Sequence, residues 1–279
     1  YDLNNKFTPN GVVSGCGVEA LTYGDVHAEQ RNKEACQATF GHNCGSMLDT
    51  LKPKYQFIHD LADFTTRNCH NINDPYFRWR KYNDKVEDDF NEVVSVLEEM
   101  GRDFCSTVIV NSNHHDHFIR WLKEADYKRD SPENALLFLE AQAEMARSII
   151  RGDDDFDIFE WFVRKQSCNN LKGVKFLKND ESFMTCGEHG IENGCHGHQG
   201  ISGARGSIAS FEKMGERYIT GHSHCPGIRS GAYVVGTLSK LDLGYNKGGL
   251  NWAHCNCVTY PNGKRSLLLI RGNKWRVLN

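Results

Sequence analysis

The stretch Val18-Glu-Ala-Leu-Thr-Tyr-Gly-Asp-Val-His27 joins a strand pattern to an aspartate and a histidine. The strand pattern runs to Tyr23, and Gly24 ends it. Other short strand patterns along the chain also end in Asp, Asn or His. The polar clusters are Asp25 with His27, His59-Asp60-Leu-Ala-Asp63, Asn111-Ser-Asn-His-His-Asp-His117, Cys195-His-Gly-His198 and Gly221-His-Ser-His224. Because the carboxyl ends of strands in an open α/β sheet meet at one crevice, these clusters predict one site of carboxylates and imidazoles.

Each cluster alone has an ordinary explanation. Asp60 and Asp63 can cap a helix, and Asn113 can be a turn residue. A lone His196 is more often a loop histidine. Five clusters in a fixed order favour a metal site instead, and their mixture of carboxylate, amide and imidazole donors suits Mn, Fe or Zn better than Mg or Ca. The candidate ligands outnumber those of one tetrahedral ion, which predicts two divalent ions, Mn²⁺ first and Fe or Zn as alternatives, bridged by Asp60.

The composition is that of an ordinary globular protein. The chain has 279 residues, 39% hydrophobic and 25% charged, with 33 Lys and Arg against 36 Asp and Glu and a formal charge of −3. A protein that holds nucleic acid by charge alone would carry a basic excess, so a polyanionic substrate would need another partner for its phosphates, such as a metal. No apolar run has the length of a membrane span, and no signal peptide pattern opens the chain.

No repeat, low-complexity tract or linker divides the sequence, so we expect residues 1–279 to form a single domain. The chain opens with Tyr1 and not methionine, which predicts the C-terminal part of a longer protein whose N-terminal region is missing. Its 11 cysteines are odd in number and widely spread, so we expect reduced thiols in a cytoplasmic protein. Cys255-x-Cys257 lacks a second pair at zinc spacing and alternates like a strand.

Alternating strands and helices predict an α/β fold with sheets covered by helices. A strand is expected over Tyr55–Ile58, and another over the β-branched run Thr107–Val110. Between Asn83 and Gly101, apolar residues recur on one face of a helix. Further elements are helices near 117–126 and 133–150, strands over Tyr218–Thr220 and Ala232–Val235, and a hairpin from Cys255 to Ile270 that turns at Pro261-Asn-Gly263.

The order of motifs Asp-x-His, x-Asp-x-x-Asp, x-Asn-His, His and Gly-His-x-His resembles the calcineurin-like metallophosphoesterase superfamily. The resemblance covers about Val18 to Trp275. Several segments look like a phage and prokaryotic branch of it, which includes early DNA-degrading and DNA-transfer proteins of T-odd siphophages. They are His59-Asp-Leu-Ala-Asp-Phe64, Ser112-Asn-His114, His196-Gly-His-Gln-Gly-Ile-Ser-Gly-Ala-Arg-Gly-Ser207, Gly221-His-Ser-His224, Leu241-Asp-Leu-Gly-Tyr-Asn246 and Tyr260-Pro-Asn-Gly-Lys-Arg265. This resemblance implies a layered sandwich of two mixed β-sheets flanked by helices, with a dimetal site at the strand carboxyl ends.

The resemblance also implies a role for each matching residue. One ion would be held by Asp25, His27 and His224, and the other by Asn113, His196 and His222, with Asp60 between them. His114 would protonate the leaving oxygen, with Asp63 supporting the site from behind the ligands. Arg205 could clamp a substrate phosphate, or be an ordinary surface ion-pair residue. His189 is an alternative to His196, although the unbroken motif around His196 favours the latter.

The sequence departs from the family pattern at three positions. His59 and Ser112 stand where glycine is usual. His115 stands where an acidic residue would orient the imidazole of His114. Asp116 or Asp63 could take over that role.

These observations predict a dimetal-dependent phosphodiesterase, and the phage resemblance favours a DNase that hydrolyses DNA through a metal-bridging hydroxide. The same metals would serve a phosphomonoesterase or a small cyclic-nucleotide phosphodiesterase. A non-catalytic, metal-organised binding module is the third alternative, which the intact motifs disfavour. A phage protein of this kind would act in the host cytoplasm. The oligomeric state, a homo-oligomer included, is left open.

Three basic and aromatic segments bear on the substrate. They are Tyr76-Phe-Arg-Trp-Arg-Lys-Tyr82, Arg120-Trp121 and Lys274-Trp-Arg276. Such segments can seat a nucleic-acid backbone or stack on unpaired bases. For Tyr76 to Tyr82 the plainer interpretation is preferred, which is an amphipathic element with its aromatic side chains in the core.

Overall fold

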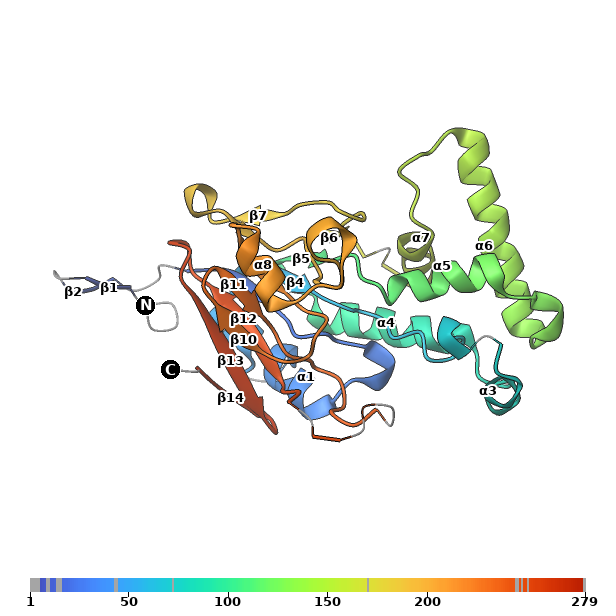
Figure 1. The fold of residues 1–279 in the computed structure, drawn as a ribbon, viewed down its shortest axis with the longest axis horizontal. Helices are drawn as coiled ribbons and strands as arrows, with labels where there is room; N and C mark the ends of the chain where they lie inside the picture. Colours follow the sequence, from blue (N-terminus) through green and yellow to red (C-terminus); the bar gives the residue numbers. More distant parts are fainter. Residues whose placement is uncertain are drawn as a thin grey trace. The chain divides into compact units, whose positions relative to one another are not determined.

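The computed structural model describes residues 6–8, 11–13, 17–42, 45–71, 73–169, 171–243, 246, 248–249 and 251–277. Contacts divide the chain into two compact units. Unit 1 comprises residues 1–61, 99–112 and 173–279 and holds the described sheets, whereas unit 2 comprises residues 62–98 and 113–172 and is helical (Figure 1). Because contact-defined units are not the same as independently folding domains, a single domain over 1–279 stays a prediction. Among the described residues, no helix is long and apolar enough to cross a membrane.

The larger sheet of unit 1 has seven strands. In spatial order they are β14 (Lys274–Val277), β13 (Arg265–Arg271), β12 (Cys255–Thr259), β3 (Val18–Thr22), β4 (Pro53–Ile58), β5 (Ser106–Ile109) and β6 (Val174–Phe176). Strands β3 to β6 are parallel, and β12 to β14 continue the sheet with antiparallel pairing. The parallel strands therefore all end at the same edge of this sheet.

The smaller sheet of unit 1 has five strands. In spatial order they are β10 (Gly227–Arg229), β11 (Ala232–Val234), β9 (Arg217–Thr220), β8 (Ile191–Glu192) and β7 (Met184–Thr185). The three central strands are parallel, and both edge strands are antiparallel to their neighbours. A separate antiparallel ribbon is formed by β1 (Lys6–Thr8) and β2 (Gly11–Val13).

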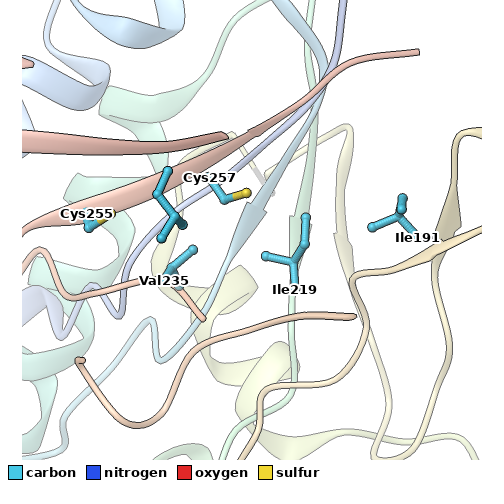
Figure 2. Packing of buried hydrophobic residues seen from close by; sticks show 6 residues of the cluster. Ile191, Ile219, Val235, Cys255 and Cys257 are labelled. Atoms are coloured by element: carbon cyan, nitrogen blue, oxygen red, sulfur yellow. The ribbon is translucent and has the colours of Figure 1, made fainter. Parts of the chain in front are cut away.

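A shared apolar core joins the two sheets. Ile191 and Ile219 from the smaller sheet, with Val235 just after β11, pack with Cys255 and Cys257 of β12 (Figure 2). All five side chains are fully buried, and removing a large aliphatic side chain from water contributes about 1.5–3 kcal/mol. The Cys-x-Cys pair is thus core packing in a strand, as its alternation predicts. The cysteines whose side chains the structure describes are free thiols.

Helices cover the outer faces of both sheets. Asn256, between the two core cysteines, points to the opposite face and donates to Thr39 Oγ1 on α1 (Lys33–Phe40). It also lies against Met47 Sδ on α2 (Met47–Leu51). On the smaller sheet, Phe211 of α8 (Ile208–Lys213) packs with Tyr218 of β9. These contacts confirm the expected α/β class with two mixed sheets flanked by helices.

Unit 2 is built from helices around an aromatic core. The helices are α3 (Pro75–Arg80), α4 (Val86–Met100, whose last turn enters unit 1), α5 (His115–Glu124), α6 (Pro132–Arg151) and α7 (Ile158–Gln166). The ring of Phe90 on α4 lies 4.8 Å from that of Phe118 on α5 and 4.4 Å from that of Phe162 on α7. Ser131 caps α6 by accepting the N–H of Asn134, and Gly152 ends it with φ +68°.

Most predicted elements are present with small shifts at their ends. The hairpin of β12 and β13 pairs Thr259 with Arg265, and Gly263 takes φ +74° in the turn. One interpretation is wrong: in the segment Tyr76 to Tyr82, the side chains of Tyr76 and Trp79 are 68% and 71% exposed. The short helix α3 has no fully buried residue, and Phe77 is its one half-buried side chain.

Candidate metal centre

Four loops of unit 1, each following the carboxyl end of a strand, carry Asp and His side chains to one place. The side chains are Asp25 and His27 after β3, Asp60 after β4, His196 after β8, and His222 and His224 after β9. Strands β3 and β4 are parallel neighbours in the larger sheet, as are β8 and β9 in the smaller one. Each sheet therefore contributes a pair of adjacent loops.

The side chains form two groups that share one carboxylate. The first group is Asp25, His27, Asp60 and His224, and the second is Asp60, His196 and His222. Within each group, one potential ligand atom from every residue lies within 4.8 Å of the others. Asp60 Oδ2 is 3.1 Å from His196 Nε2 and 3.8 Å from His27 Nε2. Asp60 thus occupies the shared position that a bridging ligand requires.

The first group brings three donors especially close. His224 Nε2 is 3.0 Å from Asp25 Oδ2 and 3.1 Å from His27 Nε2. Two imidazole nitrogens that face each other at this distance need a proton or a cation between their lone pairs. The arrangement suits a cation, because Asp25 adds a negative charge at the same point.

The cluster is almost completely buried. The side chains of Asp25 and His27 are 0% exposed, and that of Asp60 is 1% exposed. Burying two carboxylates together is costly unless positive charge compensates them. His222 is half-buried and so gives the cluster its access to solvent.

Main-chain hydrogen bonds hold the loops together independently of any ligand. The N–H of His27 donates to the carbonyl of Asp60 at 2.7 Å, which ties the loop after β3 to the loop after β4. In the smaller sheet the N–H of Gly221 donates to the carbonyl of His196, also at 2.7 Å. The N–H of Leu238 donates to the carbonyl of Asp25 at 2.7 Å. The donor positions are therefore set by the fold.

Backbone strain gathers at the same residues. His27, Asp60, His222 and His224 have φ values of +43°, +40°, +69° and +57°. A side chain in this left-handed region costs about 1–3 kcal/mol, and such residues persist where the surrounding structure holds them. Four strained residues among six cluster members are typical of a functional site.

The electrostatics favour a neutral His222 and an ionised Asp25. Burial, with the neighbouring His196, lowers the pKa of His222 to about 4. For Asp25, burial alone would raise the pKa, but the hydrogen bond from His224 and the charge of His196 outweigh it and lower the pKa. Metal ions bind these deprotonated forms. Near neutral pH these two residues are therefore in the state that binds metal.

Gly221 lies so close to Asp25 that the position has no room for a side chain. A Cβ atom at this position would lie 2.1 Å from Asp25 Oδ1, so any other residue would displace the carboxylate. Asp25 Oδ1 is buried and accepts no hydrogen bond from the described residues. A buried carboxylate oxygen of this kind calls for an explanation, and a cation supplies one. The donors of this cluster thus fit a divalent metal.

Unit 2 contains a second pair of predicted residues. Asp63 Oδ1 lies 3.0 Å from Nδ1 of His114, the residue that precedes α5. His115 stacks on Phe159, with ring centroids 4.0 Å apart. An acidic residue at position 115 would have its carboxylate buried against this aromatic ring. The charged neighbours of Asp116 are Lys123, Asp157 and Arg120. Of the two acids that the sequence offered for orienting His114, the structure pairs it with Asp63.

The remaining candidates are placed as follows. His189 is exposed in the short turn before β8 and is not part of either buried group, whereas His196 is part of one. Arg205 is exposed in the loop that closes on itself through the hydrogen bond from the N–H of Gly206 to the carbonyl of His198. Its role as a phosphate clamp stays a prediction. Asn113 belongs to unit 2, and its role as a ligand also stays a prediction.

Three residues near the cluster have no role assigned from the sequence. His59 is buried, with Nδ1 3.4 Å from Nδ1 of His196, and burial with the nearby His196 lowers its pKa to about 3. The ring of His198 lies 5.6 Å from that of His196. Trp252 packs edge-on to His224 with ring centroids 4.2 Å apart. His59 and His198 stand inside the quoted motifs, whereas nothing in the sequence singles out Trp252.

Comparison with known proteins gives one relative. The chain is similar to protein A1 of Escherichia phage T5, with 41% identity over 281 residues, which take in 99% of this chain and 50% of that protein. The chain thus spans about half the length of this curated relative. No protein-family model and no solved structure matches the chain. The similarity supports a phage protein of the T5 kind.

Proposed function

We propose that this chain is a phosphodiesterase that depends on two divalent metal ions and hydrolyses DNA. The observation that carries the proposal is the position of Asp60 in both buried groups of Asp and His side chains. The order of sequence motifs, which resembles metallophosphoesterases, supports the reaction type. The choice of DNA is supported by the resemblance to the phage branch and by the phage relative.

Each residue of the cluster has a task in this proposal. Asp25, His27 and His224 hold one ion, His196 and His222 hold the other, and Asp60 serves both. When bound, such ions stabilise charge on phosphate oxygens and lower the pKa of water toward neutrality. Imidazole with carboxylate favours Mn, Fe or Zn, and we take Mn²⁺ as the first choice.

The surrounding residues keep this arrangement fixed. Trp252 packs on one side of His224, and His59 lies against His196. Loss of such supporting residues commonly weakens metal binding or activity about 10- to 100-fold. His114, oriented by Asp63, is the proposed donor of a proton to the leaving oxygen, with Asn113 an additional ligand, both on sequence grounds.

Substitution of Asp60 tests the proposal most directly. We expect Asp60→Asn to lower turnover by more than about 100-fold. Loss of a residue that only supports a metal ligand already lowers affinity or activity by up to about that factor, and Asp60 is a proposed ligand itself. Metal content, measured by elemental analysis, should fall in the same variant. Asp103→Asn, which removes an exposed carboxylate of unit 1, is the matched control and should change neither turnover nor metal content. Full activity in Asp60→Asn would rule out the shared-ligand assignment.

The substrate class needs a separate assay. Linear and circular DNA with Mn²⁺ should be degraded, and p-nitrophenyl phosphate serves as the small-ester comparison. Hydrolysis of the small ester without DNA degradation would replace the DNase by a phosphomonoesterase. Metal binding without either reaction would leave a metal-organised binding module.

A further inference from the structure

Helix α3 (Pro75–Arg80) presents two aromatic side chains to solvent. Tyr76 and Trp79 are three residues apart, which places them on the same helix face. Their ring centroids are 5.5 Å apart and their planes cross at 85°. The side chains of Tyr76 and Trp79 are 68% and 71% exposed. By contrast, Trp121, in another of the basic and aromatic segments, is 1% exposed and belongs to the core of unit 2.

The cations beside these rings have no acidic partner among the described residues. Arg78 and Arg80 are exposed, and no described residue forms an ion pair with either. Asp74, the acid nearest in sequence, caps α3 by accepting the N–H groups of Tyr76 and Phe77. Arg80 follows Tyr76 by four residues and so shares the face of the two rings. The result is an exposed surface of two aromatic rings and uncompensated guanidinium groups.

A cavity of about 140 Å³ adjoins this surface within unit 2. Phe77, Arg78 and Tyr82 contribute to its walls, with the amide side chains of Asn68 and Asn71. Amides offer donors and acceptors of the kind that pair with a base edge. The acids in the wall are already engaged, as in the bond from Arg67 Nε to Asp130 at 2.7 Å and that from Arg129 Nε to Asp126 at 3.2 Å. The cavity is therefore not an acidic site.

We propose that this surface, Tyr76, Arg78, Trp79 and Arg80 with the adjoining cavity, binds unpaired DNA. The bases stack on Tyr76 and Trp79, and Arg78 and Arg80 contact the phosphates. Single-strand binding combines a few cations with aromatic stacking, and it does not require a large basic excess, which this chain with a charge of −3 lacks. A duplex offers no free base faces to the rings. The choice of DNA as the strand rests on the proposed function.

Fluorescence anisotropy with a labelled single-stranded oligothymidylate tests the proposal. The full chain is used in EDTA, so that binding is measured without cleavage. We expect Tyr76→Ala and Trp79→Ala each to weaken binding about 10-fold or more, because each removes a stacking platform. Arg78→Ala and Arg80→Ala should weaken binding and reduce the salt dependence by about 0.7 in log–log slope for each lost phosphate contact.

Matched controls come from other exposed residues of unit 2. Ile149→Ala with Ile150→Ala removes apolar side chains that are 77% and 84% exposed on α6, away from α3 in the sequence. Lys172→Ala removes an exposed cation. Both controls should bind the oligonucleotide like the unchanged chain. Circular dichroism checks that each variant keeps its helices.

The outcomes separate this proposal from the proposed function. Loss of oligonucleotide binding in the ring variants, with Mn²⁺-dependent hydrolysis of bis-p-nitrophenyl phosphate retained, supports it. Binding that is lost in the ring variants, in the absence of any hydrolysis by the unchanged chain, would support the surface while overturning the proposed function. Equal binding by the unchanged chain and the ring variants would overturn the surface. So would a Trp79-dependent self-association, seen by sedimentation, without oligonucleotide binding.

Discussion

His114 takes its orientation from Asp63, whose Oδ1 lies 3.0 Å from the ring nitrogen Nδ1. The contact leaves Nε2 on the far side of the imidazole as the atom suited to donate a proton. The sequence alone offered Asp63 and Asp116 equally for this role. The geometry separates them because the side chain of Asp116 has other charged neighbours.

We expect His114→Ala to keep its metal and to lose activity on esters with poor leaving groups. The loss should be about 10²- to 10⁴-fold, the usual contribution of a general acid. Hydrolysis of p-nitrophenyl esters, whose leaving group departs without a proton, should change little. Asp63→Asn should lose less activity, because the amide oxygen of the new side chain still accepts a hydrogen bond from Nδ1–H of His114. Elemental analysis and kcat on both ester types measure this.

The control for this pair is His70→Ala, which removes an exposed histidine of the same unit. It should behave like the unchanged chain in both assays. Loss of metal from His114→Ala would make that residue a ligand and not the acid.

Helix α4 is tied to the segment that precedes α3 by one buried acid. Asp89 accepts hydrogen bonds from the N–H of Thr66 at 3.0 Å and from its hydroxyl at 2.8 Å. Burial raises the pKa of Asp89 to about 6, although both hydrogen bonds act to lower it. At neutral pH the folded chain therefore carries a carboxylate that is better solvated when the chain unfolds.

Asp89→Asn should raise the free energy of unfolding at pH 7 by up to about 3 kcal/mol. The folded pKa lies above the unfolded value of about 3.9, so the folded state binds the proton more tightly, and stability from this group rises as pH falls from about 7 to about 4. The amide keeps both contacts with Thr66, because it can accept from the N–H and donate to the hydroxyl. Near pH 4 the substitution should leave the free energy of unfolding almost unchanged.

Urea unfolding at the two pH values measures the difference. Asp88→Asn, an exposed neighbour on the same helix, should show no such pH-dependent gain. An equal gain at pH 7 and pH 4 in Asp89→Asn would mean that the buried charge is not its cause.

Across the molecule, the sequence predicted the features that depend on neighbours along the chain. The strand pattern that stops at Gly24 identified β3, and the 3.6-residue period with Gly101 identified α4. The turn residues before Lys264 identified the hairpin of β12 and β13. Each of these signals lies within the element itself, so the elements could be found without knowing what packs against them.

Features that depend on distant residues could not be predicted in the same way. The 3.1 Å contact of Asp60 with His196 joins two sheets, and only the order of motifs pointed to it. Whether Trp79 faces the core or solvent depends on what α3 packs against, and the sequence of α3 alone does not indicate that. Trp252 reaches His224 from a segment with no motif at all. The two-residue strands β7 and β8 are too short to leave a pattern.

The whole of unit 1 should respond to metal, because the cluster joins loops from both sheets. At 100 times its dissociation constant, Mn²⁺ should raise the free energy of unfolding by about 3 kcal/mol per site and the Tm by about 5–10 °C. Thermal unfolding with EDTA and with Mn²⁺ measures this shift. Hydrogen exchange should slow in residues 24–28, 59–61, 196–198 and 221–224, the loops that hold the donors.

Asp60→Asn should abolish most of the Tm shift, since it removes the ligand common to both groups, whereas Asp103→Asn should keep it. A Tm that is the same with EDTA and Mn²⁺ in the unchanged chain would mean that the buried Asp and His side chains stabilise one another without a cation.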